Sequence, residues 1–197
     1  MNTKKTSLLL PALFFLLMIL ACQSYAPIAT PTPTIDPVAC VTQTEPTQAD
    51  IDFTLDFGDK IFTGGDWKRA YTVESQRLSA SWTSDDLSSV GYLDYLIFSC
   101  GTTADELEGY FNRDYWPVLF QNYEGYEPIN SCGSLASTKL WEFDATSSGS
   151  DYQVLYWVRQ ESASRVLTMF FVYPPDSETI MQAYATQMFP DLTSCAP

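Results

Sequence analysis

Histidine is absent from the 197-residue chain, and this absence excludes several classes of enzyme. Ser-His-Asp and Cys-His sites need an imidazole base, as do His-ligated zinc centres and the usual proton shuttles near neutral pH. Glycine is scarce, at nine residues, and the stretch FTGGDWK has neither Walker nor dinucleotide-binding spacing. Lys60, Lys68 and Lys139 lie outside any Ser-x-x-Lys motif. These absences favour a non-enzymatic protein that uses no cofactor.

Positive charge is also scarce, with 10 Lys and Arg against 24 Asp and Glu and a net charge of −14. Such a balance opposes nucleic-acid binding, which depends on neutralising phosphates. It also opposes electrostatic adsorption to anionic lipids. Solubility of an exposed protein accounts for the acidity, and a specific cationic partner is the alternative explanation.

A hydrophobic run long enough to span a membrane is missing at the N-terminus. Leu8–Ala21 is uncharged, but a helix of that length rises only about 21 Å against a hydrocarbon core of about 30 Å. With Lys4 and Lys5 before it, the run has the form of a secretory signal, residues 1–21. A plain signal peptide or an uncleaved anchor are the alternatives.

The residues that end this run, Ile19-Leu20-Ala21-Cys22, resemble the lipobox of bacterial lipoproteins, Leu-[Ala/Ser]-[Gly/Ala]-Cys. Ile19 and Leu20 depart from that pattern in ways the lipobox tolerates. The resemblance implies cleavage before Cys22, a diacylglyceryl group on its sulfur, and a freed amine open to acylation, for instance with palmitate. Two or three acyl chains hold a protein stably to a bilayer, whereas one does so only marginally. The membrane contact is therefore expected at Cys22.

Residues 22–49 are rich in proline and threonine and have no regular apolar period, so they are expected to form a spacer that leans toward polyproline geometry. Its last residues can equally be an ordered lead-in. Residues 50–197 are of the size expected for a single domain.

Five cysteines leave four once Cys22 is assigned to the anchor: Cys40, Cys100, Cys132 and Cys195. Export to an oxidising compartment favours two disulfides over a thiol metal site, which would need CxxC spacing or histidine. Of the three possible pairings, we expect Cys100–Cys132 and Cys40–Cys195.

Local patterns predict the order strands, helix, strands, helix. Strict alternation predicts a half-buried strand over residues 50–57. Residues 67–84 read as one or two strands bent near Glu74–Gln76, and residues 90–100 as another strand. Thr103 and Glu106 form a capping box for a helix that Pro117 ends or kinks. The remaining predicted elements are a short strand near 128–132, a three-strand meander over 137–145, 151–159 and 165–173, and a helix over 176–189 with Ile180, Met181, Tyr184 and Met188 inward.

These elements indicate the α+β class, with an antiparallel meander and helices on one face. A meander that ends in an apolar strand, then a proline-led turn into an amphipathic helix (VLTMFFVYPPDSETIMQAYATQMF), resembles the PsbP-like fold. That resemblance covers element order over residues 67–190. It implies a scaffold that binds partners and carries no transferable catalytic residues. A cystatin-like or other α+β sheet fits almost as well.

Two residue groups are candidate sites. Asp50, Asp52, Asp56 and Asp59 lie close in sequence, but Leu55 stands where an EF-hand needs glycine, and a solvated strand face explains them better than calcium. The segment Tyr110–Tyr126 holds seven aromatics. Helical spacing buries most of them, which leaves Tyr123 and Tyr126 as candidates for exposed binding aromatics.

The sequence thus predicts an extracytoplasmic lipoprotein attached to the plasma or outer membrane through its lipid. Its domain is expected to bind a protein or another envelope component, without metal or nucleic acid. The alternative is a lipid-anchored hydrolase, or a carbohydrate- or solute-binding component, that uses carboxylates and aromatics.

Overall fold

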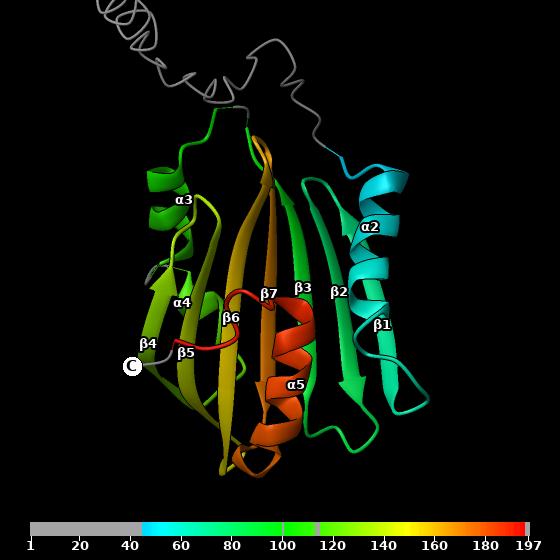
Figure 1. Ribbon diagram of the computed structural model, residues 1–197, viewed down its shortest axis with the longest axis vertical. Helices are drawn as coiled ribbons and strands as arrows, with labels where there is room; N and C mark the ends of the chain where they lie inside the picture. The colour runs from blue at the N-terminus through cyan, green and yellow to red at the C-terminus, as the bar shows by residue number, and fades with distance from the viewer. Residues whose placement is uncertain (1–44, 100, 113–114, 196–197) are drawn as a thin grey trace, which may run out of the picture. The chain divides into compact units, whose positions relative to one another are not determined.

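Seven antiparallel strands form one sheet in the order β1-β2-β3-β7-β6-β5-β4 (Figure 1). A computed structural model describes residues 45–99, 101–112 and 115–195. The strands are β1 (Trp67–Glu74), β2 (Arg77–Ser84), β3 (Val90–Ile97), β4 (Gly125–Gly133), β5 (Thr138–Ser147), β6 (Ser150–Ser162) and β7 (Arg165–Tyr173). The helices are α2 (Gln48–Asp59), α3 (Ala104–Phe111), α4 (Trp116–Leu119) and α5 (Glu178–Met188), with the 3-10 turn η1 (Pro175–Ser177) before α5. The predicted α+β class and the β5–β7 meander are confirmed.

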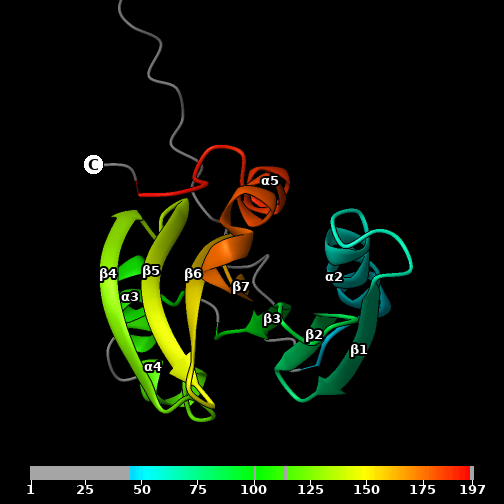
Figure 2. The same ribbon diagram turned by 90° about the horizontal axis from the view of Figure 1, so that it is seen from below.

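Helices cover both faces of the sheet, which corrects the expectation of helices on one face. Figures 1 and 2 show α2 and α5 on one side and α3 and α4 on the other. The first core lies under α2 and α5 and includes Trp82, Trp157 and Phe171. The second lies under α3 and α4 and includes Phe111 and Tyr156. β6 and β7 are apolar on both faces, so both faces must be covered.

Residues 50–57 form most of α2, not a strand as the alternation predicted. Thr47 caps the helix: its hydroxyl accepts from the Asp50 amide at 3.2 Å, and the Asp50 carboxylate accepts from the Thr47 amide at 2.7 Å. Thr54 and Gly58 are buried and Ile51 is half-buried, which is the spacing of one helical face. This capping box begins at Thr47, before the alternating stretch, and ends at its first residue, Asp50, so it favours a helix there.

Two further expectations need correction, and a third is confirmed over a longer stretch. Pro117 lies in the first turn of the separate helix α4, where its missing N–H costs nothing, so it begins a helix here. Ile180 is exposed on α5, whereas Met181, Ala185 and Met188 are buried. The predicted short strand near 128–132 is the nine-residue β4.

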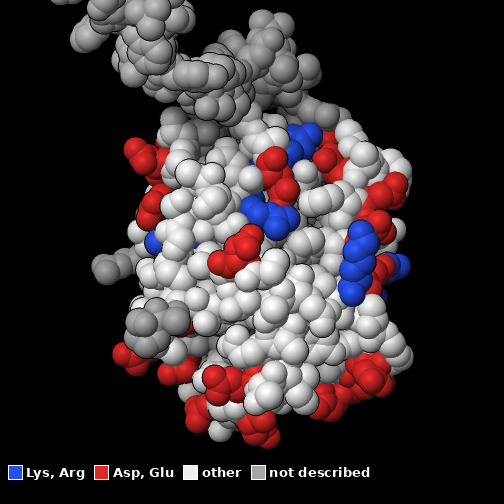
Figure 3. Space-filling view, viewed as in Figure 1, with Lys and Arg blue, Asp and Glu red and all other residues white. Residues whose placement is uncertain are grey.

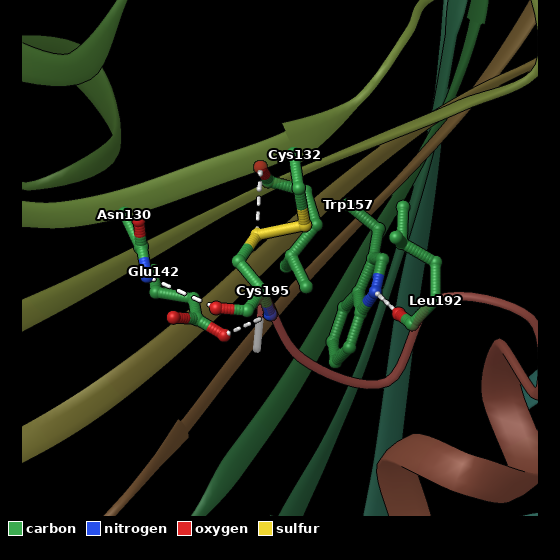
Figure 4. The surroundings of a disulfide bond; sticks show 7 residues. Asn130, Cys132, Glu142, Trp157, Leu192 and Cys195 are labelled. Carbon is green, nitrogen blue, oxygen red and sulfur yellow. Dashed lines mark hydrogen bonds between the residues drawn. A yellow bond between two sulfur atoms is a disulfide. The ribbon is translucent and has the colours of Figure 1, made fainter. Parts of the chain in front are cut away.

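The disulfide joins Cys132 on β4 to Cys195 near the C-terminus (Figure 4). Both predicted pairings, Cys100–Cys132 and Cys40–Cys195, are therefore wrong. After α5 the chain turns back across the sheet toward β4, which places Cys195 beside Cys132. Cys40 and Cys100 lie outside the described residues.

Hydrogen bonds hold the segment that carries Cys195. Figure 4 shows the Cys195 amide donating to the Glu142 carboxylate at 2.7 Å and the Asn130 amide group donating to the Cys195 carbonyl at 3.0 Å. The buried indole of Trp157 donates to the Leu192 carbonyl at 2.8 Å. The C-terminal segment is thus fixed to β4, β5 and β6 by polar contacts and by the disulfide together.

The predicted signal (1–21), the anchor Cys22 and the spacer up to residue 44 lie outside the described residues. Among the helices of the described part, none has the length and apolar character needed to cross a bilayer.

Candidate functional site

The half of the sheet made of β1–β3 carries polar residues on the face away from α2. Pairing brings Ser79 of β2 opposite Asp94 of β3, and Ser81 opposite Tyr92. Tyr92 in turn lies opposite Phe170 of β7. The apolar core under α3 and α4 contains no residue of β1 or β2. This face is therefore the floor of a candidate site, next to the part of the sheet that α3 and α4 cover.

Asp94 is the centre of a polar network on this floor. The side chain is 2% exposed, and its carboxylate accepts from Arg77 Nε at 3.0 Å, Arg77 Nη2 at 2.9 Å and the Ser79 hydroxyl at 2.6 Å. The Tyr92 hydroxyl also accepts from Arg77 Nη2, at 3.0 Å. A buried carboxylate loses its hydration, so these hydrogen bonds replace the water it gave up.

Burial alone would lower the pKa of Arg77, but the hydrogen bond and the charge of Asp94 outweigh burial and raise it. The guanidinium therefore stays charged and neutralises Asp94. The network presents no net charge to a ligand.

α4 and the residues around it form a wall beside this floor. Tyr115 and Tyr123 are half-buried, and Asn122 is exposed. Wall and floor enclose a hollow of about 350 Å³, which we call the tyrosine pocket. Its lining is Arg77, Val90, Tyr92, Asp94, Tyr115, Val118, Leu119, Gln121, Asn122, Tyr123, Phe170 and Val172.

The tyrosine hydroxyls in this wall are protonated at neutral pH. Burial raises the pKa of Tyr115 to about 12, and the charge of Asp94 adds to the effect. Burial also raises the pKa of Tyr123 to about 12. These groups can donate and accept hydrogen bonds, but they do not exchange a proton near neutrality. The lining thus offers aromatic faces, hydroxyls and amides, which is a composition suited to binding.

The two aromatics singled out from the sequence lie in different places. Tyr123 lines the tyrosine pocket. Tyr126 is 37% exposed and stacks on Phe120, with ring centroids 4.4 Å apart, outside that pocket. Sequence reasoning missed Tyr92, Tyr115 and the Arg77–Asp94 pair. One signal was present: Asp94 interrupts an otherwise apolar strand, VGYLDYLIF, where a carboxylate needs a partner.

A second hollow, of about 550 Å³, lies at the end of β4–β6 and is lined in part by Glu127, Asp144 and Asp151. Glu127 faces Asp144 across the β4–β5 pair. All three residues are exposed, whereas a carboxyl that acts as a general acid near neutral pH is normally desolvated. This arrangement gives no support to a hydrolase that uses paired carboxylates.

Within the described residues, His, Cys, Asp and Glu form no group of three that could hold a metal ion. Asp52, Asp56 and Asp59, which the sequence brought together, are exposed on α2. Asp59 instead pairs with Arg69 and accepts from the Trp82 indole at 2.9 Å.

Comparison with known proteins assigns no family. No family model matches the chain, and no curated protein matches it. Among solved structures, the chain is similar to LpqN, described as involved in cell envelope biogenesis of Mycobacterium tuberculosis. The sequences are 14% identical, the match covers 66% of this chain and 78% of LpqN, and the TM-score is 0.34. At these values the likeness transfers neither a role nor a site residue.

Proposed function

We propose that the protein is an extracytoplasmic lipoprotein, anchored through Cys22, whose domain binds a component of the cell envelope without catalysing a reaction. The observation that carries the binding role is the tyrosine pocket. It combines a charge-neutral polar floor on β2 and β3 with an aromatic wall formed by α4 and the residues around it. Pockets of roughly 300–1,000 Å³ take small molecules or single groups of larger ones.

Of the two partner classes expected from the sequence, the pocket favours a non-protein envelope component. A hollow of about 350 Å³ is too small for a protein surface but fits one or two hydroxylated rings. Aromatic faces pack against the apolar side of such rings, and the amides of Gln121 and Asn122 can bond to hydroxyls. The expected ligand group is therefore neutral and hydroxyl-rich, as in an envelope carbohydrate.

Calorimetric titration of the full-length protein in detergent with soluble monosaccharides and disaccharides tests this binding role. Tyr115→Ala and Asn122→Ala should each weaken binding of the saccharide that binds best, by about tenfold, the effect of one lost contact of about 1.4 kcal/mol. Tyr126→Ala is the matched control, because it removes an exposed aromatic outside the pocket and should leave affinity unchanged. Equal losses in Tyr115→Ala and Tyr126→Ala, or no saccharide binding by the wild type, would contradict the proposal.

The anchor has its own test, since Cys22 lies outside the described residues. Cys22→Ala should release the protein from membranes into the soluble fraction, because the acyl chains supply the attachment. A Cys22→Ala protein that stays in the membrane fraction would show that another segment holds it.

A further inference from the structure

The sheet has two edge strands, and they differ in how well they could accept another strand. β1 pairs with β2 in an uninterrupted register over all eight residues. β4 contains Pro128, and its pairing with β5 shifts between Pro128 and Asn130. Proline and bulges blunt an edge strand against pairing, whereas a regular strand without them is a template for it. In the described part of the chain, β1 has β2 as its sole strand neighbour.

The ladder determines which backbone groups of β1 point outward. The Asp85 amide donates to the Asp66 carbonyl at 2.9 Å, so even-numbered residues of this segment bond toward β2. Backbone groups alternate in direction along a strand, and those of Arg69, Tyr71 and Val73 therefore point away from the sheet. The side chains of Tyr71 and Val73 are 50% and 46% exposed. β1 thus offers outward hydrogen-bonding groups and an apolar surface together.

We propose that β1 pairs with β1 of a second copy of this chain, antiparallel about a twofold axis at Tyr71. In that register Tyr71 lies opposite its own copy, and Arg69 lies opposite the second copy's Val73. All of these residues have outward backbone groups, as hydrogen-bonded pairs of an antiparallel ladder require. The two seven-stranded sheets then join into one.

Charge complementarity selects a second copy as the occupant. The same register places Lys68 opposite the second copy's Glu74, and the twofold axis repeats that pair. Opposite charges directly across a strand pair stabilise it. The arrangement is unusual for a chain of net charge −14, because β1 carries Lys68 and Arg69 near one end and Glu74 at the other. Figure 3 shows side chains of both signs together on the side where Figure 1 draws α2 and β1.

The ion-pair partner of Lys68 does not block the pairing. Lys68 bonds to Asp85 at 2.8 Å, but both side chains are more than half exposed. Exposed ion pairs contribute little and exchange partners readily. The interface is one strand from each copy, so the dimer is expected to be weak and to depend on concentration.

Cross-linking in membranes tests the register. Full-length protein with Tyr71→Cys, produced as two differently tagged copies in one cell, should give a mixed-tag dimer with a short bismaleimide. Val73→Cys is the matched control. In the proposed register the thiols that Val73→Cys introduces in the two copies are four residues apart along the paired strands, which is about 13 Å at about 3.3 Å per residue. This variant should therefore give much less cross-linked product. Equal yields from the two variants would contradict the register. Cross-linking of Tyr71→Cys to another protein or within its own chain would overturn pairing between copies.

A charge exchange tests the complementarity. Lys68→Glu should raise the dimer dissociation constant of the detergent-solubilised full chain by about tenfold, measured by analytical ultracentrifugation. Glu74→Lys should do the same, and the double variant Lys68→Glu/Glu74→Lys should recover the wild-type value. Lys60→Glu, an equal charge change at the residue that follows α2, is the control and should leave dimerisation unchanged. A thermal melt of each variant checks that it is folded. If the folded double variant does not recover the wild-type dissociation constant, the proposal is overturned. A wild type that stays monomeric at every concentration would also overturn it.

Discussion

In the β4–β7 half of the sheet, which we call the covered half, β6 and β7 are buried on both faces, although the edge strand β4 is exposed at seven of its nine residues. The β1–β3 half, which we call the open half, is covered on one face. In β7 all residues from Val166 to Tyr173 are buried, and in β6 all from Val154 to Val158. In β1 seven of the eight residues are exposed, and in β2 burial alternates residue by residue. Burial therefore falls from the almost fully buried β7 to the largely exposed β1, with β3 and β2 between them.

The difference shows where stability and binding reside. The covered half gains from apolar burial, from aromatic contacts such as Trp157 on Phe189, and from the disulfide. The open half has less apolar surface to bury. It depends on a polar network around Asp94 that also forms the floor of the tyrosine pocket. Variants that separate these two sources of stability test the comparison.

The largest effect is expected from Arg77→Met in the open half. This substitution leaves the buried carboxylate of Asp94 without its counter-ion, and breaking such a pair costs about 3–5 kcal/mol. Urea denaturation should show the loss as a lower midpoint. The double variant Arg77→Met/Asp94→Leu removes both charges and should recover most of it. A small loss in Arg77→Met alone would show that the open half does not rely on this pair.

The next effect is expected from Cys132→Ser/Cys195→Ser in the covered half. Closing a loop between residues 63 apart stabilises a protein by about 4 kcal/mol in the chain-entropy model. Thermal or urea unfolding measures the loss. A fall much smaller than that of Arg77→Met would show that packing holds the C-terminal segment without the covalent bond.

Disulfide mapping by mass spectrometry of the native protein accompanies this experiment. It should recover the Cys132–Cys195 peptide. If the protein holds two disulfides, as the even cysteine count after Cys22 predicts, the other must join Cys40 to Cys100. A Cys100–Cys132 or Cys40–Cys195 peptide would contradict the pairing described above.

The covered half was the more predictable from sequence. Its strands β6 and β7 contain continuous apolar runs, and short polar turns separate β5, β6 and β7, which is the pattern of consecutive hairpins. The capping box of Thr103 and Glu106 also identified α3. The prediction missed the second helical layer. The continuous apolar runs of β6 and β7 already imply burial on both faces, but only the assembled sheet shows that α3 and α4 cover the second face.

The open half shows the opposite. The stretch Asp50–Phe57 alternates as a strand would, yet it forms part of α2, because Thr47 and Asp50 cap a helix there. The candidate site depends on pairing between strands: Arg77 and Asp94 are 17 residues apart, and only the β2–β3 register brings them together. The disulfide was mispredicted for the same reason, since sequence does not show where the chain turns after α5.

A smaller effect compares the two helical layers through their glycines. Gly58 of α2 lies against the indole of Trp82, and an added Cβ would overlap that ring. Gly58→Ala should therefore destabilise the protein by about 1–3 kcal/mol through overpacking. Gly109 of α3 has nothing within 4 Å of such a Cβ, so Gly109→Ala should stabilise by up to about 1 kcal/mol through helix propensity. Opposite shifts in melting temperature are expected, and shifts of the same sign would contradict the packing described for α2.

The smallest effect compares the two capping boxes. Thr47→Ala in α2 and Thr103→Ala in α3 each remove a side-chain cap, which costs about 0.5–2 kcal/mol. Thr47→Ala should cost more than Thr103→Ala, because the hydrogen bonds of Thr47 are partly buried and Asp50 also pairs with Arg165. The exposed α3 box should depend on pH, since hydrogen bonds from Thr103 lower the pKa of Glu106. Its contribution is present above the ordinary glutamate pKa and is lost as the pH falls through the lowered value. Thr103→Ala keeps the backbone amide that donates to Glu106 at 2.7 Å, so Glu106→Gln is the variant for this test. Urea denaturation of wild type and Glu106→Gln at several pH values should show their difference shrinking in acid, and a difference that stays constant would show that the charge of Glu106 does not contribute.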